Sequence, residues 1–166
     1  MNTTIVQLSP PDSTGGNGPE TQPATPVIRN ADFWPDIDVE HYRRTIRQDG
    51  TIPYERLREY LIQAMAETNR QLAEYAAVQK ATGYLTLSGV PADKIDGESV
   101  QMQRYRRAVY SATRALITEQ FRGTDTTQPG DMRAQSLEST TAELWRQFQW
   151  AISDIQGRSH TVVELI

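Results

Sequence analysis

Residues 98–122 read ESVQMQRYRRAVYSATRALITEQFR, and this stretch decides the fold. Apolar side chains recur along it every three or four residues, at Tyr105, Val109, Ala112 and Leu116. This spacing is typical of a helix with one buried face, because successive helical turns place such residues on the same side. We therefore expect one long helix over the whole stretch, with an apolar face that other elements must cover.

Two further long helices and one short helix are predicted around it. The segments 53–82 and 133–156 carry apolar residues at the same helical spacing. A short helix is expected from Asp36 or Asp38 to about Arg47, because an aspartate side chain can accept hydrogen bonds from the free N–H groups of a first turn. The sequence therefore predicts an all-α fold, an antiparallel helical bundle of three long helices plus one short helix.

The beginning of the chain differs in composition from the helical part. Residues 1–29 hold five of the nine prolines, a glycine-rich cluster at 15–18, and no basic residue before Arg29. Such a segment buries too little apolar area to offset its ordering entropy, so we expect an extended, intrinsically mobile arm. The predicted organisation is an arm over 1–29, a helical domain over 30–157 and a C-terminal tail over 158–166.

The last six residues are mostly β-branched or apolar and prefer strand conformation. We find no second strand in the sequence that could pair with them. An unpaired apolar strand invites aggregation, so we expect a partner to supply the other sheet edge. The alternative is that these residues fold back on the helices as an apolar cap. The strand-forming residues are Thr161, Val162, Val163, Leu165 and Ile166.

Composition excludes several classes of function. The net charge is −4, from 17 basic and 21 acidic residues, which argues against binding nucleic acid through bulk charge. The chain has no cysteine, and no signal peptide or membrane-spanning run is visible, so we expect a soluble intracellular protein. His41 and His160 lie far apart, and the acidic residues Asp93, Asp96 and Glu98 fit turn and helix-start positions better than a calcium loop. We therefore predict no catalytic residue, no metal and no cofactor.

One basic cluster invites a functional interpretation. Arg104, Arg106 and Arg107 surround Tyr105, and such a group could contact DNA phosphates while the tyrosine stacks on a base. The alternative is a solvated face of arginines that pair with acidic neighbours, and the acidic charge of the chain favours it. Tyr105 lies on the apolar stripe, so we expect it in the core.

Three large aromatic residues are candidates for contacts between subunits. Phe33 and Trp34 lie at the root of the arm, where they could cover the core locally or anchor the arm to a neighbour. Trp145 falls on the apolar stripe of its helix, whereas Trp150 lies off it. A tryptophan off the stripe of an amphipathic helix suggests a second buried face and hence a partner surface, so we predict that Phe33, Trp34 and Trp150 make subunit contacts. The alternative for Trp150 is burial in the core of its own subunit.

A series of short fragments, in this order and spacing, closely resembles the head completion protein (GPL) family of temperate contractile-tailed phages. The resemblance covers roughly residues 28–158. The fragments are FWPDID (33–38), RLR (56–58), MAETN (65–69), VPAD (90–93), IDGES (95–99), RAV (107–109), FRG (121–123), GD (130–131), ELWR (143–146), WA (150–151) and IQGR (155–158).

The resemblance implies a structural role without catalysis. Proteins of this family join the portal vertex after DNA packaging, stabilise the filled head and form the site to which the tail attaches. They resemble helical head–tail adaptors, which form rings under a dodecameric portal. The implied partners are the portal protein, a tail or tail-terminator protein, and further copies of the chain in a ring that we expect to be a dodecamer.

The same resemblance places the protein in the neck of the virion, after assembly in the host cytoplasm, with no membrane contact. The tail residues 161–166 are then expected to bind the portal. Packaged DNA would pass through the ring without specific binding, which an acidic protein favours. Two alternatives stay open, a small DNA-packaging or nucleic-acid-binding helical factor, for which Arg104, Arg106 and Arg107 would be the evidence, and a free helical regulator.

Overall fold

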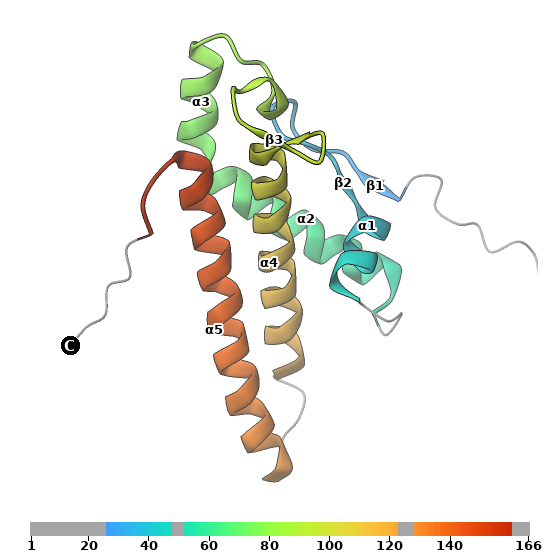
Figure 1. The fold of residues 1–166 in the computed structure, drawn as a ribbon. Coiled ribbons are helices and arrows are strands. Elements are labelled where there is room, and N and C mark those ends of the chain that lie inside the picture. The colour runs from blue at the N-terminus through green and yellow to red at the C-terminus, as the bar shows by residue number, and fades with distance from the viewer. Residues whose placement is uncertain (1–25, 48–51, 123–127, 161–166) are drawn as a thin grey trace, which may run out of the picture.

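The computed structural model describes residues 26–47, 52–122 and 128–160 (Figure 1). Helices make up most of this described part, which confirms a largely helical fold. In chain order the elements are β1 (Val27–Ile28), β2 (Ile37–Asp38), α1 (Val39–Ile46), α2 (Tyr54–Gln71), α3 (Ala73–Ala81), the short 3-10 helix η1 (Leu87–Gly89), β3 (Lys94–Ile95), β4 (Glu98–Ser99), α4 (Val100–Arg122) and α5 (Gln128–Gln156).

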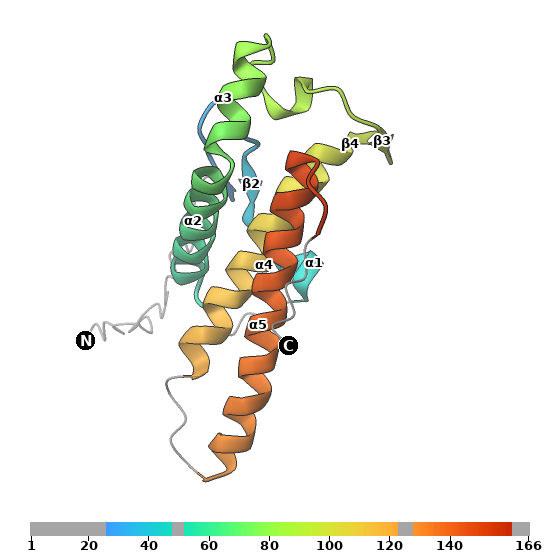
Figure 2. The same cartoon turned by 90° about the vertical axis from the view of Figure 1, so that its left-hand side faces the viewer.

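Helix α4 is the centre of the molecule. Helix α5 runs antiparallel along one side of it, and α2 packs on a different face (Figures 1 and 2). The predicted stripe is confirmed, because Tyr105, Val109 and Ala112 are fully buried. No helix in the described part of the chain is both long and apolar enough to cross a membrane. The helices that cover α4 bury the side chains Leu57, Leu61, Ala64, Phe148, Ile152 and Ile155.

The helix predicted over 53–82 is wrong in one respect, because it is two helices. At Leu72 the backbone leaves helical geometry, with φ −99° and ψ 9°, and α3 then continues in a new direction (Figure 1). The Leu72 side chain is fully buried, and its N–H still donates to the Thr68 carbonyl over 3.1 Å. Apolar residues keep their spacing of three or four across the bend, so periodicity alone could not reveal it.

The predicted all-α fold also left out two short strand pairs. Strands β1 and β2 pair antiparallel, and so do β3 and β4. Strand β4 occupies the first two residues of the helix predicted over 98–122, so this helix begins at Val100 instead. Asp96 and Gly97 join the second pair with φ of 53° and 75°, the left-handed values that a two-residue hairpin turn requires. Strands of two residues are too short to produce an alternating sequence pattern, which explains why they were missed.

Helix ends agree with the sequence at three points. Asp38 precedes α1, and its Oδ1 accepts hydrogen bonds from the N–H groups of Glu40 (2.8 Å) and His41 (3.2 Å). Gly83 and Gly157 follow α3 and α5 with φ of 100° and 67°, which glycine adopts without strain. Helix α5 begins earlier than predicted, at Gln128.

The predicted arm lies outside the described residues except for its last four. Of these, Val27 and Ile28 form β1, and the Ile28 side chain is buried in the core. Phe33 and Trp34 are also buried, at 2% and 8% exposure, and the Trp34 ring stacks on Tyr105 with centroids 5.1 Å apart. Both rings therefore cover the chain's own core, which was the alternative interpretation, rather than a surface open to a neighbour.

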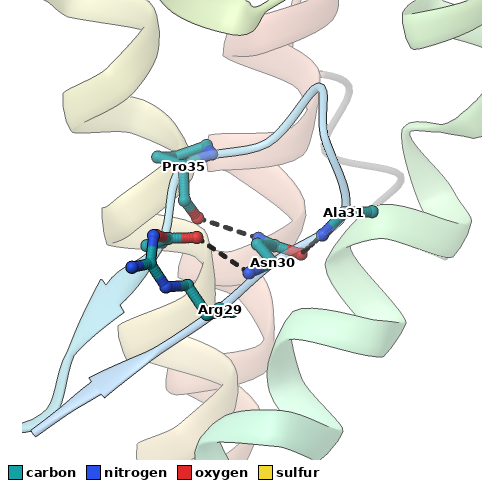
Figure 3. A network of polar contacts seen from close by, with 5 residues as sticks. Arg29, Asn30, Ala31 and Pro35 are labelled. Atoms are coloured by element: carbon teal, nitrogen blue, oxygen red, sulfur yellow. Dashed lines mark hydrogen bonds and ion pairs between the residues drawn. The ribbon is translucent and has the colours of Figure 1, made fainter. Parts of the chain in front are cut away.

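A turn over residues 29–36, here called the Asn30 turn, fixes this segment in place (Figure 3). The Asn30 amide nitrogen donates to the Pro35 carbonyl (2.9 Å), and its oxygen accepts from the Ala31 N–H (2.9 Å). Asp36 accepts from the Asn30 N–H over 2.8 Å and pairs with Arg29 over 3.0 Å. The turn is thus closed by bonds from both of its ends.

The Asn30 turn is tied to α2 and α4 through the hydroxyl of Tyr105. This hydroxyl donates to the Asn69 side chain (2.6 Å) and accepts from the Asn30 amide (2.8 Å). The Asn69 amide in turn donates to Asn30 over 2.8 Å. Burial raises the pKa of Tyr105 well above its usual value, so the hydroxyl stays protonated and able to donate. Three separate segments therefore meet at one buried hydroxyl.

Replacing Tyr105 by phenylalanine tests this junction. Tyr105→Phe keeps the ring but leaves the amides of Asn30 and Asn69 without one partner each, so we expect a loss of about 1–2 kcal/mol in urea unfolding. Tyr54→Phe is the matched control, because the Tyr54 hydroxyl makes no hydrogen bond with the described residues. Equal stability of the two variants would contradict the proposed importance of the junction.

Candidate interaction surfaces

The predicted DNA-facing arginines behave differently from one another. Arg106 forms an ion pair with Glu98, and Arg107 lies 3.8 Å from Asp154 of α5. Arg104 is partly exposed and makes no ion pair with the described residues. Tyr105, between them, is fully buried and cannot stack on a base. The geometry of Arg106 and Arg107 fits the alternative interpretation, arginines that pair with acidic neighbours.

A groove lies between α1, α4 and α5, and we call it the arginine groove. Its volume is about 310 Å³. At its wall, His41 Nδ1 lies 2.7 Å from the Tyr110 hydroxyl, whose pKa is raised to about 12 mainly by burial. Its third arginine, Arg114, is exposed and makes no ion pair with the described residues. The lining residues are His41, Thr45, Ile46, Gln103, Arg106, Arg107, Tyr110, Ser111, Arg114 and Gln147.

Trp150 lies outside the core, on the outer side of α5. Its ring stacks on His160 with centroids 5.3 Å apart and planes 9° from parallel, and the Arg146 guanidinium lies 5.2 Å from the ring centroid. His160 Nε2 is 2.8 Å from a carboxylate oxygen of Asp154. We call Trp150, His160, Arg146 and Asp154 the Trp150 cluster. His160, expected to be solvated or packed, therefore holds the chain after α5 against the helix.

Trp145 lines a second groove, of about 470 Å³, between α2, α4 and α5. Its ring packs edge-on against the buried Phe148 at 5.6 Å, as its place on the apolar stripe predicted. Its ring N–H donates to Glu119 over 2.7 Å. Small side chains, including Ala64 and Ala112, form much of the remaining lining, so this groove is shallow and largely apolar.

Large apolar side chains are exposed near the end of the molecule formed by α3 and the β3–β4 hairpin (Figure 1). They are Val78, Leu85 and Ile95, with exposures of 54%, 76% and 61%. Among the described residues, no group of three or more histidine, aspartate or glutamate side chains is placed to hold a metal ion. The exposed side chains of Val78, Leu85 and Ile95 form a candidate apolar contact surface.

A model of the family described as phage head completion protein (GPL) matches residues 28–166 of the chain. The chain belongs to this family. The first residue matched, Ile28, is also the first buried residue in the part of the chain that the structure describes. The family is one of structural phage head proteins and not of enzymes, and it implies association with the virion.

Two curated relatives extend the family match. The head completion/stabilization protein of Escherichia phage P2 is 42% identical over 168 residues, covering 100% of this chain and 99% of the relative. The probable head completion/stabilization protein of Haemophilus phage HP1 is 25% identical over 95 residues, covering 57% of this chain and 63% of the relative. No solved structure matches the chain. The alignment with the phage P2 protein includes the first 27 residues, which lie outside the resemblance seen in the sequence.

The predicted strand residues Thr161, Val162, Val163, Leu165 and Ile166 lie outside the described residues, so their role stays a prediction. Trp150 remains the aromatic candidate for a subunit contact, since Phe33 and Trp34 are buried. The sequence analysis did not identify Asn30, for which a lone asparagine before an aromatic pair was the only signal.

Two aromatic residues on α5 offer a matched test of the Trp150 cluster. Trp150→Ala removes a half-buried ring that lies outside the core and packs on His160 and Arg146, so we expect a loss below about 1 kcal/mol in thermal or urea unfolding. Phe148→Ala, which empties a fully buried site on the same helix, should cost about 3–5 kcal/mol. A loss for Trp150→Ala as large as that for Phe148→Ala would place Trp150 in the core.

Proposed function

We propose that this protein joins the portal vertex of the filled phage head, stabilises it and forms the surface to which the tail attaches. The observation that carries this proposal is the alignment with the phage P2 head completion/stabilization protein along the full length of both chains. In this role the protein is a component of the virion neck and is assembled in the host cytoplasm.

The described surfaces support an adaptor. The α4–α5 pair gives a long rigid core, while the grooves, the Trp150 cluster and the exposed apolar end are distinct surfaces at different places on it. A subunit that contacts several partners at once needs several such surfaces. We therefore infer three partners, namely the portal protein, a tail or tail-terminator protein and neighbouring copies of the chain.

Neighbouring copies are proposed to form a ring, with the twelve-fold symmetry of a portal. Ring closure requires a heterologous contact, in which one patch of a subunit meets a different patch of the next. Trp150 is proposed to lie in or near this contact, because an aromatic ring outside the core is the kind of side chain that anchors interfaces. The DNA would then pass through a channel lined by a protein of net charge −4, without specific binding.

The C-terminal residues 161–166 are proposed to bind the portal by adding a strand to one of its sheet edges. Main-chain hydrogen bonds would supply affinity, and alternate side chains would enter pockets. The β-branched residues of the segment favour such an extended conformation. The last described residue, His160, is exposed and lies outside the helical core.

Deletion of residues 161–166 tests the portal contact. We expect the helical circular dichroism signal to be unchanged and co-sedimentation with purified portal rings to be lost, because the strand that pairs with the portal is gone. Full-length Glu164→Gln, which keeps the apolar residues, is the control and should still sediment with the rings. Unchanged portal binding by the deletion variant would exclude the tail as the portal-binding segment.

Ring formation and DNA binding can be separated in the same material. Trp150→Ala should reduce the fraction of protein assembled into rings on portals, while the variant stays folded.

The competing DNA-packaging or nucleic-acid-binding function requires duplex DNA to bind the free protein, with an affinity that falls steeply as salt rises. We expect no such binding, because Arg106 and Arg107 already pair with Glu98 and Asp154. Salt-dependent binding that Arg104→Glu abolishes would favour the alternative function.

A further inference from the structure

The chain reverses direction as it leaves α5. Gly157 has a left-handed φ of 67°, and the Arg158 N–H donates back to the Ser153 carbonyl over 2.9 Å. This pattern ends a helix and turns the following residues back alongside it. Both views show the chain turning downward after the end of α5, and in Figure 1 it lies on the side of α5 away from α4. His160, the last described residue, is then held by Trp150 and Asp154.

His160 lies close to one wall of the arginine groove, through Asp154. Gln147, Trp150 and Asp154 lie three or four residues apart on α5 and so share one side of the helix. Asp154 contacts both His160 (2.8 Å) and Arg107 (3.8 Å), and Arg107 and Gln147 line the groove. The tail therefore starts beside one wall of this groove.

The charges of groove and tail are complementary. Two of the three groove arginines are already paired, Arg106 with Glu98 and Arg107 with Asp154, whereas Arg114 makes no ion pair with the described residues. The tail residues 161–166 contain a single charged side chain, the carboxylate of Glu164. An unpaired guanidinium at the wall of a groove favours a carboxylate partner, which it can bind through two parallel hydrogen bonds.

The distance from Arg107 to Arg114 along α4 is also within reach of a tail that runs from His160 to Glu164. Arg114 lies seven residues after Arg107 on α4, which is about 10.5 Å along the helix axis. Glu164 lies four residues after His160, and an extended chain of that length spans about 13 Å. Strand alternation would place Val162 on the same side as Glu164, toward the apolar wall formed by Ile46 and Tyr110.

We propose that, in the free subunit, residues 161–166 occupy the arginine groove of their own chain, with Glu164 paired to Arg114. The inference deepens the proposed function, on which its biological meaning rests, because the same residues are proposed to bind the portal. The groove would shelter an aggregation-prone strand until a sheet edge competes for it. A neighbour that covers Trp150 would also displace His160 and release the tail.

The N-terminal residues 1–25 are the other segment that could fill the groove. They are acidic as well, with Asp12 and Glu20 and no basic side chain. They join the described chain at Pro26, whose carbonyl accepts from the Val39 N–H at the start of α1. We favour the tail, because the His160–Asp154–Arg107 contacts already bring it to the groove wall.

Backbone order of the tail in the full-length, isotopically labelled protein tests the proposal without any portal. From NMR relaxation we expect order parameters of about 0.8 for residues 162–165 in the wild type, and below about 0.6 in Arg114→Glu and in Glu164→Gln. Arg104→Glu, on the same helix but outside the groove, is the matched control and should leave the tail ordered. The charge swap that combines Arg114→Glu with Glu164→Arg should restore order.

Several outcomes would overturn the inference. Order parameters below about 0.6 in the wild-type tail would show that it is not held in the groove. If the tail stays ordered in Arg114→Glu, and this variant keeps its helical signal, the Glu164–Arg114 ion pair is excluded. Order that appears only as protein concentration rises would assign the groove to a second copy, and Arg114→Glu disordering residues 1–25 instead of the tail would assign it to the N-terminal segment.

Failure of this inference is distinguishable from failure of the proposed function. If the wild-type tail is disordered but portal binding still depends on residues 161–166, only the docking of the tail in the arginine groove of its own chain is excluded. If the wild-type tail is ordered but the variant without residues 161–166 binds portals equally well, the docking in the groove stands. The tail is then excluded as the portal-binding segment.

Discussion

The requirement that the buried hydroxyl of Tyr105 find partners organises the structure. Burying a hydroxyl without hydrogen bonds costs about 1–3 kcal/mol, and Tyr105 is fully buried in the second turn of α4. Asn69 from α2 and Asn30 from the N-terminal turn supply these bonds, so the hydroxyl sets how both segments sit on α4. Once Asn30 is fixed, Trp34 stacks on the Tyr105 ring and Phe33 closes the core beside it. One polar atom thus positions the segment that seals an otherwise apolar core.

Helical spacing in the sequence predicted the faces of α4 and α5 well, because long amphipathic helices repeat one pattern many times. Tyr105, Val109 and Phe148 are buried as that pattern requires. The bend at Leu72 and the two-residue strands were not predictable in this way. The bend keeps the apolar spacing intact, and the strands depend on pairings that a sequence pattern of two residues cannot reveal. The burial of Phe33 and Trp34 likewise depends on a turn closed by side-chain bonds.

The candidate surfaces were harder to predict than the fold, because each is assembled from distant parts of the chain. The arginine groove combines His41 of α1 with Arg114 of α4 and Gln147 of α5. The sequence drew attention to Arg104, Arg106 and Arg107 as a run, yet Glu98 and Asp154 pair with two of them. Arg114 has no charged neighbour in the sequence within three residues. Packing therefore decides which arginine has no acidic partner among the described residues. The role in head completion was indicated by the family resemblance alone.

The wide sequence separation at the Tyr105 junction has a consequence for the order of folding. Helices α4 and α5 are neighbours in the chain and pack along their lengths, so their association closes a short loop. The bond from Asn30 to Tyr105 joins residues 75 positions apart, and the entropy of closing so long a loop delays it. The helical hairpin is therefore expected to form early, and the Asn30 turn to dock last. By the same argument, the turn is the first part to detach when the subunit unfolds.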